Sequence, residues 1–125
     1  VPVGAHLSGG LDSSTLACLA SSLLGTPIHT FTGGFVGEQY DETSYARIVA
    51  QHIGSNHHQV FPTADDFVEV MPRLIYHMDE PVAGPGLFPQ YFVSELSFKT
   101  GSFGTVAPAN STTPSILPPF LTSIV

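Results

Sequence analysis

The 125-residue sequence predicts an α/β fold, a Rossmann-like parallel sheet with helices on both faces. Short apolar and β-branched runs alternate with segments of helical periodicity, and the connections between them are short. A serine- and glycine-rich turn joins the first apolar run directly to the first helical segment. A second glycine pair, Gly33-Gly34, ends the second run. Since ligands of such sheets bind beyond the carboxyl ends of the strands, both glycine turns are expected to line one crevice.

Three strands and four helices are expected. The strands cover residues 1–7, 28–32 and 57–61, and the helices cover residues 13–24, 42–53, 64–77 and 89–98. Gly25 and Gly54 are natural C-caps for the first two helices. Asp41 is a good N-cap for the second helix, and Thr63 to Asp66 resembles a capping box for the third.

Apolar residues at helical spacing indicate which face of each helix should meet the sheet. The expected stripes are Leu16, Leu19, Ala20 and Leu23 in the first helix, Tyr45, Ile48, Val49 and His52 in the second, and Phe67, Val70, Met71, Leu74 and Ile75 in the third. Pro72 is expected to kink the third helix.

The stretch from Ser8 to Ser14, Ser-Gly-Gly-Leu-Asp-Ser-Ser, has the composition of an anion-binding loop. Two adjacent glycines let the backbone approach a phosphate closely. The unpaired amides of the following helix turn point at the ligand, with the positive end of the helix dipole behind them. A carboxylate beside phosphates, Asp12, is best explained by a bridging Mg²⁺. The alternative is a serine–glycine turn that merely begins a helix.

Charge and composition restrict the partners. The formal net charge is −7, and the only fixed cations are Arg47, Arg73 and Lys99, which argues against nucleic acid. No signal peptide and no membrane-spanning apolar run are evident, so a soluble, cytoplasmic protein without a membrane partner is expected. The single cysteine, Cys18, is interpreted as a small buried hydrophobe.

The six histidines do not predict a transition-metal site. His57 and His58 are adjacent, so on a strand they face opposite sides of the sheet. His52 and His77 fall on separate helices, and no cysteine or carboxylate has zinc-site spacing.

The loop is not a Walker motif, because its glycine spacing is shorter and no lysine follows. Instead it resembles the pyrophosphatase loop of enzymes that cleave ATP between the α and β phosphates. From Val1 to about Leu96 the chain resembles the synthetase domain of glutamine-hydrolysing asparagine synthetases, whose fold is that of the adenine nucleotide alpha hydrolases. The resemblance is carried by short motifs in this order along the chain: residues 3–5 followed by 8–14, then residues 31–35, 40–42, 57–58, 77–81 and 88–91.

This resemblance implies a two-step reaction with ATP and Mg²⁺. The aspartate side-chain carboxylate is adenylated with release of pyrophosphate, and ammonia, or glutamine through a glutaminase domain, then supplies the nitrogen of asparagine. The positions that match the family's nucleotide site are Leu7, Ser8, Gly9, Gly10, Leu11, Asp12, Ser13, Ser14 and Gly33. Asp12 would hold Mg²⁺, while Leu7 and Gly33 would line the adenosine. Gly33 departs from the family's usual β-branched residue. Asp79 and Glu80 are candidates for binding metal or the substrate amine, and the alternative is that they cap the next segment.

The resemblance stops after Lys99, which divides the chain into a partial synthetase domain, residues 1–99, and a Ser/Thr/Pro-rich tail, residues 100–125. The tail has no charged residue and no strand or helix periodicity, so a disordered coil foreign to the fold is expected. The fold is therefore expected to be incomplete and the fragment inactive. A β-lactam synthetase, a GMP synthetase-like adenylating enzyme or a non-catalytic nucleotide-binding remnant remain alternatives, and the oligomeric state is open.

Overall fold

The computed structural model describes residues 3–35, 42–78, 86–101 and 104–106 and confirms the α/β class. The strands are β1 (Val3–His6), β2 (His29–Gly33), β3 (Asn56–Val60) and β4 (Gly104–Val106). The helices are α1 (Leu11–Leu24), α2 (Thr43–Ile53), α3 (Ala64–Met78) and α4 (Leu87–Lys99). The predicted helices and the three predicted strands are therefore all present, with boundaries shifted by at most two residues. The predicted start of the first strand, at residue 1, lies outside the described residues.

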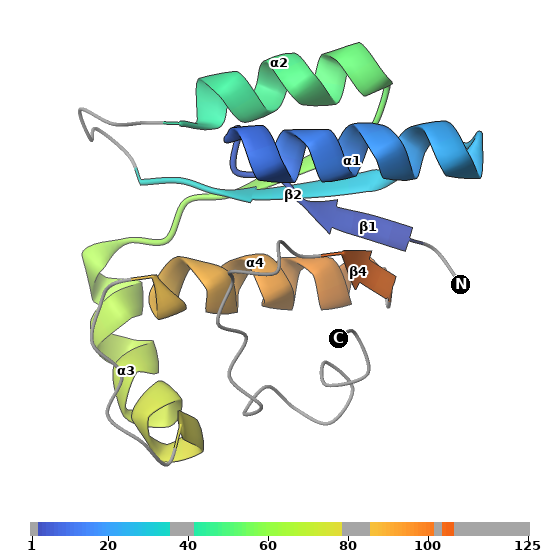
Figure 1. The fold of residues 1–125 in the computed structure, drawn as a ribbon. Coiled ribbons are helices and arrows are strands. Elements are labelled where there is room, and N and C mark those ends of the chain that lie inside the picture. The colour runs from blue at the N-terminus through green and yellow to red at the C-terminus, as the bar shows by residue number, and fades with distance from the viewer. Residues whose placement is uncertain (1–2, 36–41, 79–85, 102–103, 107–125) are drawn as a thin grey trace.

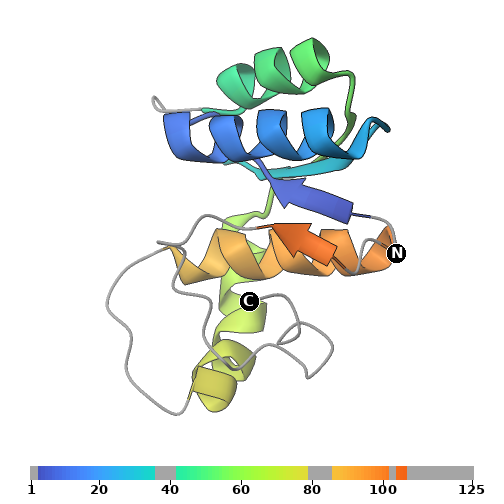
Figure 2. The same ribbon diagram turned by 45° about the vertical axis from the view of Figure 1, so that its right-hand side comes forward.

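The strands form one parallel sheet in the order β3-β2-β1-β4. Helices α1 and α2 cover one face and α4 covers the other, while α3 projects away from the sheet (Figures 1 and 2). The chain moves from β1 to β2 and β3 in one direction and then returns to place β4 on the opposite side of β1. The strand order thus reverses at β1, and this reversal is the usual position of a ligand crevice in open α/β sheets.

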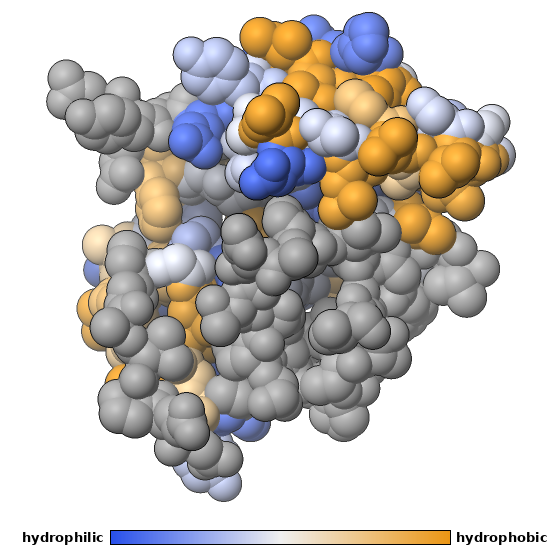
Figure 3. Space-filling view, in the orientation of Figure 1, coloured by the Kyte–Doolittle hydropathy of each residue, from blue (hydrophilic) through white to orange (hydrophobic). Residues whose placement is uncertain are grey.

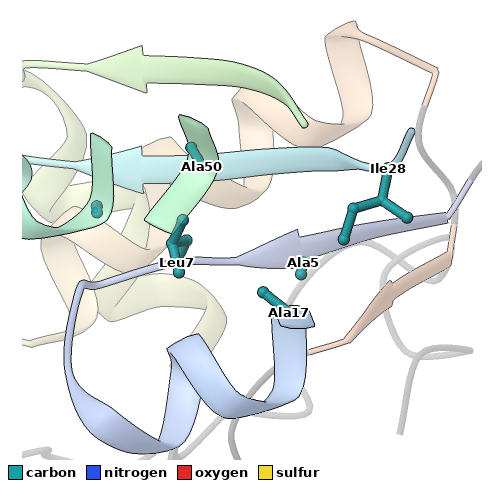
Figure 4. Packing of buried hydrophobic residues seen from close by; sticks show 6 residues of the cluster. Ala5, Leu7, Ala17, Ile28 and Ala50 are labelled. Carbon is teal, nitrogen blue, oxygen red and sulfur yellow. The ribbon is translucent and has the colours of Figure 1, made fainter. Parts of the chain in front are cut away.

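Small side chains bring α1 and α2 close to the sheet (Figure 4). The buried cluster between them consists of Ala5, Leu7, Ala17, Ile28, Ala46 and Ala50. Four of these six residues are alanines, so the helix backbones lie near the strands and small changes in side-chain volume will be felt there.

The apolar stripe predicted for α1 is wrong in part. The buried residues of this helix are Ser13 and Ala17, whereas Leu19 is 54% exposed and Leu23 is 85% exposed. Cys18 is half-buried rather than fully buried. The close approach of α1 to the sheet selects the small residues for the inner face, and the larger leucines point outward.

The buried face of α2 also differs from the apolar stripe predicted for it. Its buried residues are Thr43, Ala46 and Ala50, while Tyr45 and Ile48 are both more than 60% exposed. Together with the leucines of α1, these side chains give the face over α1 and α2 a largely apolar surface (Figure 3).

The capping box predicted for α3 is confirmed. The Thr63 backbone N–H and hydroxyl both donate to Asp66 Oδ2 at 2.7 Å, and the Asp66 N–H donates to Thr63 Oγ1. These bonds lower the pKa of the Asp66 carboxyl. The helix continues through Pro72 to Met78 and buries Leu74 as predicted, but Ile75 is 65% exposed.

The predicted C-caps of α1 and α2 are confirmed as well, because Gly25 and Gly54 both adopt left-handed backbone conformations. The predicted N-cap of α2, Asp41, lies outside the described residues. Among the helices that the structure describes, none combines the length and apolarity needed to cross a bilayer.

Strand β4 corrects the expectation of coil throughout the tail. Gly104–Val106 pairs in parallel with Val3–Ala5 of β1. Three residues without apolar alternation give no strand signal on their own, so only the free edge of β1 reveals this element.

The two adjacent histidines of β3 face opposite sides of the sheet, as predicted. His57 lies on the side of α2, where its Nδ1 is 2.9 Å from Thr30 Oγ1. His58 lies on the side of α4, where its Nε2 is 3.0 Å from His29 Nδ1 and its ring stacks on Phe31.

The burial of these histidines makes the fold sensitive to acid. Burial lowers the pKa of His6 to about 4, and it also lowers the pKa of His57 and His58. Below pH 6.5 the unfolded chain therefore binds more protons than the folded chain, and the free energy of unfolding should fall as the pH drops from 6.5 towards 4. His6 contributes up to about 1.4 kcal/mol per pH unit, and the more exposed His57 and His58 contribute less because solvent screens their charges.

Urea unfolding at pH 7.5, 6 and 5 measures this loss. The variant His6→Gln should show a shallower slope than the parent chain over the same range. An unfolding free energy that stays constant from pH 7.5 to 5 would contradict the assignment of neutral buried histidines.

Candidate functional site

The candidate site lies where β1 ends and α1 begins. In the parallel register of β1 with β2, His6 is opposite Phe31. The Leu7 N–H donates to the Phe31 carbonyl, and the Thr32 hydroxyl donates to the Leu7 carbonyl. The serine loop and the end of β2 therefore meet at one edge of the sheet, as the sequence predicts.

The Ser13 hydroxyl organises the loop from within α1. It accepts a bond from the Ser8 N–H at 3.2 Å, lies 2.9 Å from Ser8 Oγ and lies 3.2 Å from the Gly10 carbonyl. The Gly10 N–H in turn donates to Ser8 Oγ. Ser13 is buried, whereas Ser8 and Gly10 are exposed. The network thus holds an exposed loop on a buried anchor.

Gly9 is required by both conformation and space. Its φ of +87° lies in the left-handed region that side chains disfavour. A Cβ at this position would lie 2.7 Å from the Ala46 backbone nitrogen and 2.8 Å from Tyr45 Cβ, both in α2. The loop therefore packs directly against the first turn of α2.

The first turn of α1 can present several donors. The Ser14 N–H donates to the Gly10 carbonyl, whereas the amides of residues 11–13 precede the first such helical bond, and Leu11 and Asp12 are exposed. The Ser14 Oγ is buried and has no hydrogen-bond partner among the described residues. A buried hydroxyl without a partner costs free energy, which a ligand oxygen at this position would recover.

Leu7 and Gly33 occupy different environments. The Leu7 side chain is 1% exposed and belongs to the core, so only its backbone can face a ligand. Gly33 lies against α4, and a Cβ there would come within 2.8 Å of Val93 Cγ2. Val93 therefore occupies the space that a side chain at position 33 would need.

Asp12 is the candidate magnesium ligand whose position the structure describes, while Asp79 and Glu80 lie outside the described residues. In the described part of the chain, no three His, Cys, Asp or Glu side chains gather as a metal cluster. Mg²⁺ in nucleotide sites commonly uses one or two protein carboxylates plus phosphate oxygens. The exposed Asp12 carboxylate beside the loop fits that pattern.

Sequence reasoning missed two neighbours of the site. Ala46 and Val93 contact the loop and the end of β2 respectively, and both come from helices that follow in the chain. Their small or branched apolar side chains carry no signal of a ligand site. The only sequence signal was the glycine opposite each of them, Gly9 for Ala46 and Gly33 for Val93, because a missing side chain permits close packing.

Comparison with known proteins identifies similar sequences in one family. The family model described as asparagine synthase matches residues 1–102. A Mycobacterium tuberculosis protein provisionally named as a glutamine-hydrolysing asparagine synthetase is 43% identical over 100 residues, covering 79% of this chain and 15% of its own length. Asparagine synthetase [glutamine-hydrolyzing] 1 of Bacillus subtilis is 32% identical over 99 residues, covering 79% of this chain and 16% of its own length. The chain therefore spans less than a fifth of these relatives.

The two glycines of the loop should respond differently to alanine. Gly9→Ala should lower the free energy of unfolding by about 2–4 kcal/mol, because it combines a strained φ with a clash against α2. Gly10 has a φ of −73°, and a Cβ there would meet only Ser8 Oγ at 3.4 Å. Gly10→Ala should therefore cost less than about 1 kcal/mol. Urea unfolding compares the two, and equal losses would show that the packing against α2 is not tight.

Proposed function

Because the chain belongs to the asparagine synthase family, we propose that its loop from Ser8 to Ser14 binds the phosphates of MgATP for amidation of aspartate. The observation that carries this proposal is the loop at the strand reversal, with the first turn of α1 open beside it. Unpaired amides and serine hydroxyls at that position suit a polyphosphate.

The proposed reaction has two steps. A side-chain carboxylate oxygen of aspartate attacks the α-phosphorus of ATP, and the bond to the bridging oxygen breaks to release pyrophosphate. Ammonia then attacks the acyl carbon of the adenylate, and AMP leaves. For this chemistry the protein mainly positions the groups and offsets negative charge.

The chain has only three lysine and arginine residues to do this. Among the described residues, Arg47 donates to Gln59, Arg73 donates to Tyr91, and Lys99 pairs with Glu95. Phosphate charge would therefore be offset by the amides of α1, its helix dipole and a magnesium ion held by Asp12, which supplies Lewis-acid stabilisation when bound. We propose that binding is weak and strongly magnesium-dependent, with little turnover from these 125 residues alone.

Exchange of labelled pyrophosphate into ATP tests the reaction and its acceptor. Stimulation by aspartate supports the asparagine synthetase reaction. Stimulation instead by a β-lactam precursor or xanthosine monophosphate would indicate the related adenylating activities. Binding of ATP without exchange would indicate a nucleotide-binding module, and strong turnover would contradict the proposed inactivity of the fragment.

The magnesium dependence can be tested directly by calorimetric titration of ATP. ATP should bind about tenfold more tightly with Mg²⁺ than with EDTA, and Asp12→Asn should remove most of that difference. Because Asp12 is exposed, the variant should remain folded by circular dichroism. Equal ATP affinity with and without Mg²⁺ in a folded sample would contradict the proposal.

Alanine variants of two serines in α1 should distinguish an effect on stability from an effect on MgATP binding. Ser13→Ala removes the centre of the loop network and should lower the free energy of unfolding by about 1–2 kcal/mol. Ser14→Ala removes a buried hydroxyl without a partner among the described residues, so it should leave the free energy of unfolding unchanged or raise it, yet weaken MgATP binding. Unchanged affinity in Ser14→Ala would show that this hydroxyl serves no ligand.

A further inference from the structure

The first turn of α2 touches both segments of the candidate site. On one side, a Cβ on Gly9 of the loop would lie 2.7 Å from the Ala46 nitrogen and 3.0 Å from the Glu42 carbonyl oxygen. On the other side, a Cβ on Gly34, just past β2, would overlap Thr43 Cγ2. One helical turn thus fixes the separation between the loop and the end of β2.

This turn is itself held firmly. The Tyr45 and Ala46 amides both donate to the Glu42 carbonyl, at 3.1 and 3.2 Å. Ala46 is fully buried, and it belongs to the core cluster with Ala5, Leu7 and Ala17. Because backbone meets backbone at Gly9, no flexible side chain can absorb a shift of α2. A displacement of the helix would pass directly to the loop.

We infer that Ala46 is a positioning residue for the phosphate-binding loop, acting through Gly9 without touching the ligand. This inference rests on the proposed function and adds to it a control of affinity from α2. A larger side chain at Ala46 would push α2 away from β1 and release Gly9 from its support. The loop amides would then lose their fixed arrangement, on which electrostatic stabilisation of an anion depends.

Ala50 provides the matched control. It lies one turn further along the same buried face, is 3% exposed and belongs to the same core cluster, which contains no loop residue. Ala46→Val should weaken MgATP binding by about tenfold or more, whereas Ala50→Val should change it by less than about twofold. Both variants should lose similar amounts of unfolding free energy, so a general loss of stability would not produce the difference.

If Ala46→Val fails to fold, variants at Tyr45 and Ile48 test the same positioning role. Tyr45 is exposed but touches Gly9 through its Cβ, so Tyr45→Ala keeps the contact and Tyr45→Gly removes it. Ile48→Ala and Ile48→Gly measure the cost of glycine at an exposed position of the same helix. Tyr45→Gly should bind MgATP about threefold to fivefold more weakly than Tyr45→Ala, with no such difference between the Ile48 variants.

The outcomes distinguish the two proposals. Absence of MgATP binding in the folded parent chain would overturn the proposed function. Binding in the parent chain with equal losses in Ala46→Val and Ala50→Val, or with equal ratios in the Tyr45 and Ile48 pairs, would overturn the positioning role alone.

Discussion

The site depends on a single buried hydroxyl, that of Ser13. It reaches back from the first turn of α1 to the end of β1 and ties the Ser8 amide, the Ser8 hydroxyl and the Gly10 carbonyl together. A strand and a helix that follow one another could meet at many angles. These bonds select one of them, in which the loop is exposed while its anchor lies in the core. The first-turn amides of α1 are thereby directed to the edge of the sheet.

Much of the fold followed from local patterns. Glycine C-caps, the capping box at Thr63 and the alternation of strands with helices located every helix and three of the strands. The helix faces could not be derived in the same way, because hydrophobic spacing favours leucines while close helix–sheet contact favours alanine and serine. In α1 and α2 the second requirement prevailed. Strand β4 was missed because its three residues gain their order from β1 rather than from their own sequence.

The sequence predicts residues for the candidate site but not the residues that pack behind them. Ser8 to Ser14 form a chemically recognisable sequence, and parallel topology brings the end of β2 to the same edge of the sheet. Which residues stand behind the glycines depends on tertiary packing, so the contacts of Ala46 and Val93 became visible only in three dimensions. The family resemblance implies that Leu7 lines the adenosine, whereas the structure buries its side chain in the core.

The side chain of Val93 fills the space beside Gly33, so the residue sizes tolerated at the two positions depend on each other. A β-branched residue at 33 and a valine at 93 cannot coexist with the present spacing of β2 and α4, because the would-be Cβ already lies 2.8 Å from a valine methyl. A larger residue at 33 alone would clash with Val93, and a smaller residue at 93 alone would leave a void. The two changes together would restore close packing. Added bulk at Gly33 is therefore expected to require a smaller residue at Val93 if the parent chain's stability is to be kept.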